Sequence, residues 1–311
     1  MTRRTKSDNA ETIRHELVAL LQDFQKHLKD DDLREKVLAL VPCYQLLRSL
    51  GCSLIPREEA TSARQRILAY LKKYPFTIIG GEELAVVSGI GEWARRVREL
   101  RVEFGWPILS GITAREMGLE GEFPLKGVDV TEMKVDDYVL VAKVEDREAA
   151  HRWNIANQIR RKKGVGVRDK ILEFLKENVG KPVTGEELRY VASDKKEWAR
   201  RVRELRTENG WTVTTKQTGR PDLSVGVYVL ESLRQLPAHD RHIPDDVRVA
   251  VLERDNYSCT KCGWNHDKAT PSDPRHLLEL HHKEHHAHGG KNTEENLITV
   301  CNVCHDKIHR G

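Results

Sequence analysis

The chain has 311 residues, of which 39% are hydrophobic and 32% charged, and this length leaves room for two or three domains, each with its own core. No run of eighteen apolar residues occurs and the N-terminal segment lacks a signal-peptide core, which argues against a membrane or secreted protein and predicts a cytoplasmic one. The net charge of +4 only weakly favours a polyanionic partner, but arginines are concentrated in stretches such as "WARRVRELR" and "IRRKKG".

Residues 1–62 are expected to form amphipathic helices, in "TIRHELVALLQDFQKHLKD" and "LREKVLALVPCYQLLRSLG". Cys43 and Cys52 lie in this apolar setting and are interpreted as ordinary buried thiols. The segment carries no catalytic motif. The sequence leaves open whether it serves as a dimerisation element, which would give a homodimer, as a docking element or as a capping bundle.

The middle of the chain contains a repeat. Residues 63–108 and 167–213 share the blocks "GEEL", "EWARRVRELR" and "GW", and each copy later reaches "YVL", at 138–140 and 228–230. Such spacing indicates a duplicated domain. The first copy is longer near its end, with 33 positions from Gly105 to Tyr138 against 18 from Gly210 to Tyr228.

Each copy predicts the same order of elements. In the second copy, "KILEFLKENVG" reads as a helix, "KPVT" as a short strand, and "GEELRYVA" and "KEWARRVRELRTENG" as two more helices. Two strands follow in "WTVTTKQTGRPDLSVGVYVL", with "TGRPD" at their turn. This order resembles the winged helix-turn-helix fold, over about half the chain, and the extra positions of the first copy are expected to form a longer wing. The resemblance implies that the third helix enters the major groove of DNA.

The predicted recognition helices have an arginine side and an apolar side, which is formed by Trp93, Val97 and Leu100 in the first copy and by Trp198, Val202 and Leu205 in the second. Helical periodicity places four arginines away from the apolar side, and these are the predicted DNA contacts: Arg95, Arg98, Arg200 and Arg203. The segments just before the helices differ, "SGIG" (88–91) against "SDKK" (193–196), so Lys195 and Lys196 are expected to help the second copy read a different sequence. The alternative is a solvated face in which Glu99 and Glu204 partner the arginines.

The chain is therefore expected to be an α+β multidomain protein. The predicted boundaries are a helical segment (1–62), a first winged-helix domain (63–145), a basic linker (146–166), a second winged-helix domain (167–235), a short linker (236–243) and a terminal domain (244–311).

The terminal domain contains two C-x2-C pairs with 38 residues between them, Cys259 with Cys262 and Cys301 with Cys304. Paired cysteines of a reducing compartment at this spacing predict a tetrahedral structural Zn²⁺. A closed site of four sulfurs leaves no position for a substrate, so this ion is expected to fold the domain.

Between and after these pairs the chain reads "LLELHHKEHHAHGGKNTEENLITVCNVCH". The sequence places His281 next to His282, a Gly-Gly turn at 289–290, Asn296 before a leucine, and His305 after the last cysteine. Over roughly 60 residues this pattern resembles the HNH, or ββα-metal, endonuclease family. One departure is that Lys283 and His285 stand where the family commonly has Ile and Pro.

The resemblance implies roles for these residues. His282 would be the general base, and Asn296 would pin its loop or contact the metal. A catalytic divalent cation, expected to be Mg²⁺ with Mn²⁺ or Ni²⁺ as alternatives, would be held by His281, His305 and His309. The remaining histidines of the loop, which are His285, His286 and His288, are expected to face solvent or DNA.

The leading hypothesis is a metal-dependent restriction endonuclease that reads double-stranded DNA with its winged helices. The chain has no G-x4-GK[ST] motif, so no nucleotide cofactor is expected. Three alternatives stay open: a modification-dependent, type IV-like endonuclease; a DNA-binding regulator that keeps an inactive HNH scaffold; and a homing endonuclease.

Overall fold

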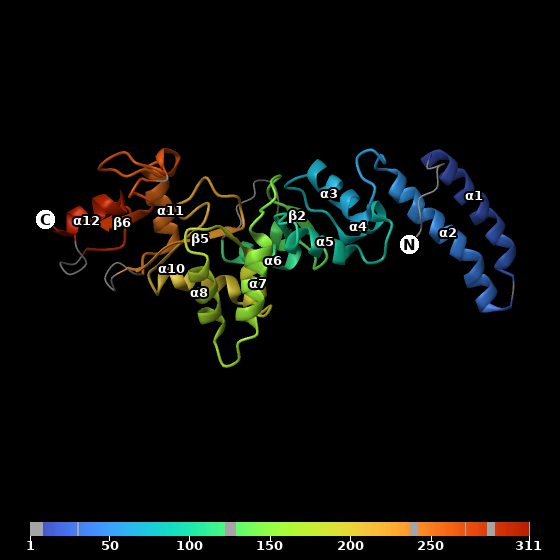
Figure 1. The fold of residues 1–311 in the computed structure, drawn as a ribbon, viewed down its shortest axis with the longest axis horizontal. Coiled ribbons are helices and arrows are strands. Elements are labelled where there is room, and N and C mark those ends of the chain that lie inside the picture. The colour runs from blue at the N-terminus through green and yellow to red at the C-terminus, as the bar shows by residue number, and fades with distance from the viewer. Residues whose placement is uncertain are drawn as a thin grey trace. The chain divides into compact units, whose positions relative to one another are not determined.

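The computed structural model describes residues 9–29, 31–121, 129–236, 242–270, 272–284 and 290–310, and for His309 and Arg310 it describes the backbone alone. The fold is mixed α and β (Figure 1). Two compact units are present: residues 1–108 with 136–147, and residues 109–135 with 148–311. No helix in the described parts of the chain has both the length and the apolar character needed to cross a bilayer.

The first unit begins with a helical hairpin. It consists of α1 (Ala10–His27) and α2 (Leu33–Ser53), which pack against each other. Asn9 and Asp32 cap the two helices by accepting hydrogen bonds from backbone N–H groups of their first turns. Both expected N-terminal helices are therefore present.

The first repeat follows in the same unit. Its elements are α3 (Ala63–Lys73), α4 (Gly81–Ser88), α5 (Trp93–Val102), β1 (Ile108–Ser110, only its first residue in this unit) and β2 (Tyr138–Leu140). Val97 and Leu100 of α5 are buried, and Trp93 packs edge-on against Tyr138 at 5.8 Å between ring centroids. The predicted apolar side of α5 therefore faces the core of the repeat. Gly89 caps the C-terminal end of α4, and its φ of 65° suits glycine.

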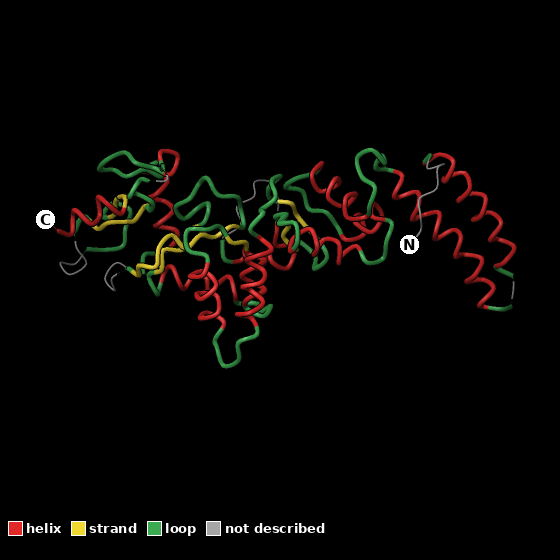
Figure 2. Tube along the Cα trace, in the orientation of Figure 1, coloured by secondary structure: helices red, strands yellow, loops and turns green. Residues whose placement is uncertain are grey.

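The second repeat lies in the second unit and has the same order of helices and final strands, with a short strand, β3 (Val183–Thr184), where the described part of the first repeat has only the isolated bridge of Ile79 with Tyr138. Its other elements are α8 (Val167–Glu177), α9 (Gly185–Val191), α10 (Trp198–Thr207), β4 (Trp211–Thr214) and β5 (Val227–Gln235). The strands form an antiparallel sheet in the order β3-β5-β4, drawn yellow in Figure 2. Trp198 packs on Tyr228 as Trp93 does on Tyr138 in the first repeat. The predicted helix–strand–helix–helix–hairpin order is thus present.

Two segments differ from expectation. Within residues 109–135, expected as a long wing of the first copy, the structure has the helix α6 (Gly111–Leu119) and the short 3-10 helix η1 (Val130–Glu132), and it groups them with the second unit. α6 packs on α9 so closely that a Cβ at Gly185 would lie 2.7 Å from Sδ of Met117. Residues 146–166, expected as a linker, contain the helix α7 (Ala149–Arg160). The reason is burial, because one face of α7 buries Trp153, Ala156 and Ile159.

A buried ion pair joins α7 to α9. Arg152 Nε lies 2.8 Å from Glu187 Oε1, and the two side chains are only 3% and 1% exposed. Burial raises the pKa of Glu187, and the Arg152 guanidinium and the hydrogen bonds from Thr184 oppose that shift. Glu187 also completes the capping box of α9 with Thr184.

Replacing Arg152 with alanine should destabilise the second unit by about 3–5 kcal/mol, because Glu187 would remain as a buried charge without its cation. Urea unfolding followed by tryptophan fluorescence measures this loss, since Trp153 is buried on the same helix. Arg147→Ala is the control, because the Arg147 side chain is 90% exposed, and it should leave the midpoint unchanged. Equal midpoints for the two variants would contradict the assigned importance of the buried pair.

The terminal domain is a small ββα arrangement with a preceding helix. Its elements are α11 (Asp245–Arg254), the 3-10 helix η3 (His266–Lys268), β6 (Leu278–His282), β7 (Leu297–Cys301) and α12 (Asn302–Arg310). β6 and β7 are antiparallel, with His281 opposite Ile298, and α12 packs on both strands. Arg206 at the end of α10 bonds Asp245 at the start of α11, with 2.9 Å between Nε and Oδ1. The terminal domain is thereby attached to the second repeat.

Candidate active site and metal centres

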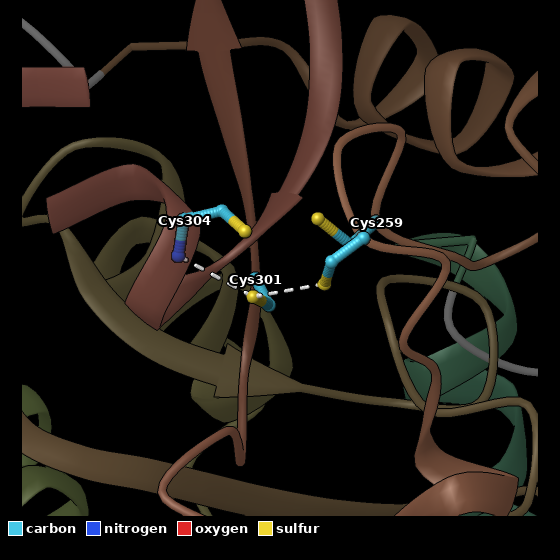
Figure 3. Close-up of side chains that lie close together, drawn as sticks. Cys259, Cys301 and Cys304 are labelled. Carbon is cyan, nitrogen blue, oxygen red and sulfur yellow. Dashed lines mark hydrogen bonds between the residues drawn. The ribbon is translucent and has the colours of Figure 1, made fainter. Parts of the chain in front are cut away.

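Four cysteines meet beside the ββα core, and Figure 3 labels three of them, Cys259, Cys301 and Cys304. Two come from the turn after α11 and two from the junction of β7 with α12: Cys259, Cys262, Cys301 and Cys304. Their sulfur atoms all lie within 4.8 Å of one another, and the sulfurs of Cys262 and Cys301 are 3.8 Å apart. Four sulfurs at about 2.3 Å from one zinc ion in a tetrahedron would be about 3.8 Å apart. The group can therefore hold a metal ion of this kind.

The thiols of this group differ in pKa: although burial opposes the shift, hydrogen bonds with the Trp264 backbone and the neighbouring cysteines lower the pKa of Cys262 to about 7. Burial raises the pKa of Cys301 to about 12 and also raises the pKa of Cys304. Four thiolates at these distances would repel one another unless a cation lay between them. A divalent ion bound by the four sulfurs would stabilise the thiolate forms.

The second group of candidate ligands lies on one face of β6. Side chains alternate along a strand, so Glu279 and His281 share a face while His282 lies on the other. The rings of His281 and His305 are 5.2 Å apart between centroids, although 24 positions separate the residues. Both rings are buried, at 8% and 3% exposure. The structure thus brings together two of the three predicted ligands of the catalytic cation.

Glu279 orients His305. Nδ1 of His305 lies 2.8 Å from Oε2 of Glu279, and the Glu279 side chain is 5% exposed. A carboxylate can only accept, so Nδ1 carries the proton and Nε2 is the nitrogen with the lone pair. Histidines that bind metals are commonly held in this way by a carboxylate. The third predicted ligand, His309, belongs to α12, but its side chain lies outside the described residues.

His282, the predicted general base, ends β6 on the opposite face and is 2% exposed. Its Nε2 lies 2.7 Å from Oδ1 of Asn292. Nδ2 of Asn292 donates to the backbone carbonyl of His242 at 3.2 Å, which fixes the orientation of the amide. Oδ1 therefore faces the ring and accepts from Nε2–H, and the basic nitrogen of this tautomer is Nδ1.

Asn296 ties together the chain on both sides of residues 285–289. Its Oδ1 accepts from the backbone N–H of Glu284 at 2.9 Å, and its Nδ2 donates to the carbonyls of Glu284 at 3.1 Å and Lys291 at 3.0 Å. Gly290 allows this approach, because a Cβ there would lie 1.9 Å from the Glu284 carbonyl oxygen. The histidines of the loop, which are His285, His286 and His288, lie outside the described residues, as does Gly289.

The predicted DNA contacts are in different surroundings in the two repeats. Arg95 and Arg200 are exposed and lie near Glu99 and Glu204 of their own helices, at 3.4 and 3.1 Å. Arg98 is also exposed. Its counterpart Arg203 pairs with Glu120, directly after α6, at 2.8 Å. The arginine sides of α5 and α10 are thus alike in sequence but not in their partners.

The segments before α5 and α10 also differ in their neighbours. In the second repeat Lys195 and Lys196 are exposed, and Asp194 bonds Arg160 of α7 at 2.9 Å. In the first repeat Arg48 of α2 donates to the carbonyl of Gly89 at 2.7 Å. The helix preceding the first repeat therefore covers part of its "SGIG" turn.

Two residues of the site, Glu279 and Asn292, were not predicted from the sequence. A signal for Glu279 existed, because it precedes His281 by two positions in a strand and so shares its face. Asn292 had no comparable signal. Its contact with His282 depends on the path of the chain between β6 and β7, and its second contact is with a residue 50 positions away.

Comparison with known families gives two matches. The model described as the KpnI N-terminal domain matches residues 64–141 and 168–231, so it covers both repeats, and KpnI is a restriction enzyme. The model described as HNH endonuclease matches residues 259–311. No curated protein and no solved structure matches the chain. The terminal domain is therefore an HNH endonuclease domain, which confirms the resemblance stated from the sequence and indicates a nuclease that hydrolyses DNA.

Proposed function

We propose that this nuclease, with an HNH domain behind two KpnI N-terminal domains, is a restriction endonuclease that reads a specific duplex sequence with both repeats. The observation that carries the proposal is the convergence of His281, His305 and Glu279 on one face of the ββα fold. The order of elements in the repeats supports reading by winged helices, with α5 and α10 in the major groove.

Hydrolysis of a phosphodiester requires that the attacking water lose a proton while charge builds on the leaving oxygen. We assign the first task to His282, with Asn292 holding its ring in the Nε2–H tautomer. His281 and His305, joined by His309 on the next turn of α12, would hold a divalent cation, with Mg²⁺ as the expected ion. When bound, this cation would act as a Lewis acid on the phosphate oxygens. Asn296 would keep the His282 loop in place through its backbone hydrogen bonds.

The four cysteines are proposed to hold a structural zinc ion, separate in role from the catalytic cation. An inactive scaffold would need only these cysteines. It would have no use for a buried carboxylate that orients His305 toward His281, and burying such polar groups costs free energy unless they are paired. The arrangement therefore favours an active enzyme over a regulator with an inactive HNH fold.

The test is incubation of the purified protein with methylated and unmethylated plasmids in the presence of Mg²⁺, Mn²⁺ or Ni²⁺, followed by mapping of the ends. A restriction enzyme should produce discrete ends at one sequence. Cleavage confined to the methylated plasmid would instead identify the modification-dependent enzyme. Absence of cleavage under every condition would contradict the proposal.

The two repeats should differ in how they use equivalent arginines. Arg98→Ala should weaken DNA binding and reduce the slope of log affinity against log salt by about 1, because an exposed phosphate contact is lost. The double variant Arg203→Ala/Glu120→Ala removes a pair whose charges already cancel, so its affinity and slope should stay near wild type. Fluorescence anisotropy across a salt series measures both. A loss of DNA affinity in the double variant as large as that of Arg98→Ala would show that Arg203 gives up its pair with Glu120 and binds a phosphate instead.

Two substitutions separate the contact of Asn292 with His282 from its contact with the His242 carbonyl. Asn292→Leu removes the acceptor for His282 and should lower the single-turnover cleavage rate by about 10–100-fold, the usual effect of losing such an orienting contact. Asn292→Asp keeps an acceptor oxygen but cannot donate to His242, and it should stay close to the wild-type rate. KM for DNA should not change in either variant. Equal loss in both would mean that the bond to His242, and not the one to His282, matters.

A further inference from the structure

The α1–α2 hairpin exposes an apolar surface that none of the described residues of its own unit covers. Among the described residues, 21 large hydrophobic side chains are exposed, and eleven of them lie between positions 18 and 54. They are Val18, Leu21, Leu28, Leu33, Val37, Leu38, Leu40, Val41, Tyr44, Leu47 and Leu54. Scattered single hydrophobic residues need no explanation, but a concentrated patch of this kind usually marks an interface.

The pattern on α2 is that of a helix with two packing faces. Ala39, Cys43, Leu46 and Leu50 are buried or half-buried on one face, and α2 packs on α1. A second set of apolar side chains on α2 is exposed. Its members are four and three positions apart in turn, so they lie within about 80° of one another around the helix axis. We call this set the α2 stripe: Leu33, Val37, Leu40, Tyr44 and Leu47, exposed by 39–73%. Alternating spacings of three and four are those of a helix that packs on another helix.

The chemistry and size of the surface narrow the choice of partner. No charged residue occurs from Val37 to Leu47, where four of the five stripe residues lie, so this part of the stripe offers no charge that would select an acidic or basic partner. At about 100 Å² for each fully exposed aliphatic side chain, the eleven exposed fractions leave on the order of 600 Å² of apolar area. A standard stable interface takes about 800 Å² from each partner, of which roughly 60% is apolar. The hairpin as a whole therefore supplies about the apolar area that one side of such an interface needs, and the α2 stripe supplies about half of it.

We propose that the partner is a second copy of this chain, with the two hairpins packed α2 against α2 as a four-helix bundle. A neutral, uniformly apolar stripe is self-complementary, as a two-fold symmetric interface requires. The reason for the chain to dimerise rests on the proposed function. Cutting both strands of a duplex takes two hydrolysis events, and the HNH model matches the chain in a single segment. A dimer would place two HNH domains in one particle.

The experiment measures the mass of the full-length, zinc-loaded protein by sedimentation equilibrium. The wild type should have twice the chain mass of 35.7 kDa, and Leu40→Glu/Tyr44→Glu should have the chain mass itself. Leu33→Glu/Val37→Glu, at the other end of the stripe, should behave identically, and circular dichroism should show both variants folded. Val144→Glu is the matched control, because Val144 is 76% exposed outside the hairpin, and it should stay dimeric. On supercoiled plasmid the stripe variants should accumulate nicked circles, whereas the wild type should give linear product.

A monomeric wild type overturns the proposal, and so does a dimer that survives folded stripe variants. These outcomes are separate from failure of the proposed function. A dimeric wild type and monomeric stripe variants would uphold the interface even if no plasmid were cut, because sedimentation does not depend on cleavage.

Discussion

His282→Ala is expected to reduce the single-turnover cleavage rate by about 10²–10⁴-fold, the usual loss when a general base is removed. Rapid-quench assays on a defined duplex with saturating protein measure this rate apart from binding. The change leaves the cysteines and the pair of Glu279 with His305 in place. Zinc content and DNA affinity should therefore match the wild type.

Two further variants make this result specific. His282 is 2% exposed, so alanine leaves a cavity at a buried position. His282→Gln fills more of that space and keeps a polar side chain, yet it cannot accept a proton near neutral pH, so it should be as slow as the alanine variant. His276→Ala removes an exposed histidine of the same domain and should cleave normally. A His282 variant that cuts at the wild-type rate would show that another group takes the proton.

Much of the fold could be predicted from the local periodicity of apolar residues. The apolar spacing of Trp198, Val202 and Leu205 predicted which side of the third helix faces the core, and all three are at most 1% exposed. The duplication could be recognised because the same sequence blocks recur at the same spacing in both copies. The spacing of the cysteines likewise predicted their convergence, because each C-x2-C pair lies at one short turn or junction.

Long-range packing accounts for what was missed. Arg206 ends the shared block "EWARRVRELR", as Arg101 does in the first copy, and its contact with Asp245 attaches the terminal domain, which the block itself could not predict. Similarly, Glu120 stands in an insert that looked like a wing, and its pairing with Arg203 exists because α6 packs beside the second repeat. Identical sequence blocks acquire different partners when the chain around them folds differently.

The largest effect on stability is expected at the cysteines. A structural zinc contributes about 10–16 kcal/mol of binding free energy, which for a small domain is free energy of folding. Entire domains are usually stable by only about 5–15 kcal/mol. The core of this domain is small, with Val251, Leu252, Trp264, Leu297 and Val300 as its main buried apolar side chains. Without the ion, the terminal domain should not fold.

Cys259→Ser should therefore lose the tightly held zinc, unfold the terminal domain and abolish cleavage. DNA binding by the two repeats should persist, because their cores do not include the cysteines. Elemental analysis should find about one zinc per wild-type chain and none in the variant. Cys52→Ser is the matched control: Cys52 is half-buried in α2, where its thiol donates to the Ser88 carbonyl, and a hydroxyl can make the same bond. That variant should keep its zinc and its activity. A Cys259→Ser protein that is soluble, zinc-free and fully active would show that a metal ion held by the four sulfurs is not what holds the domain together.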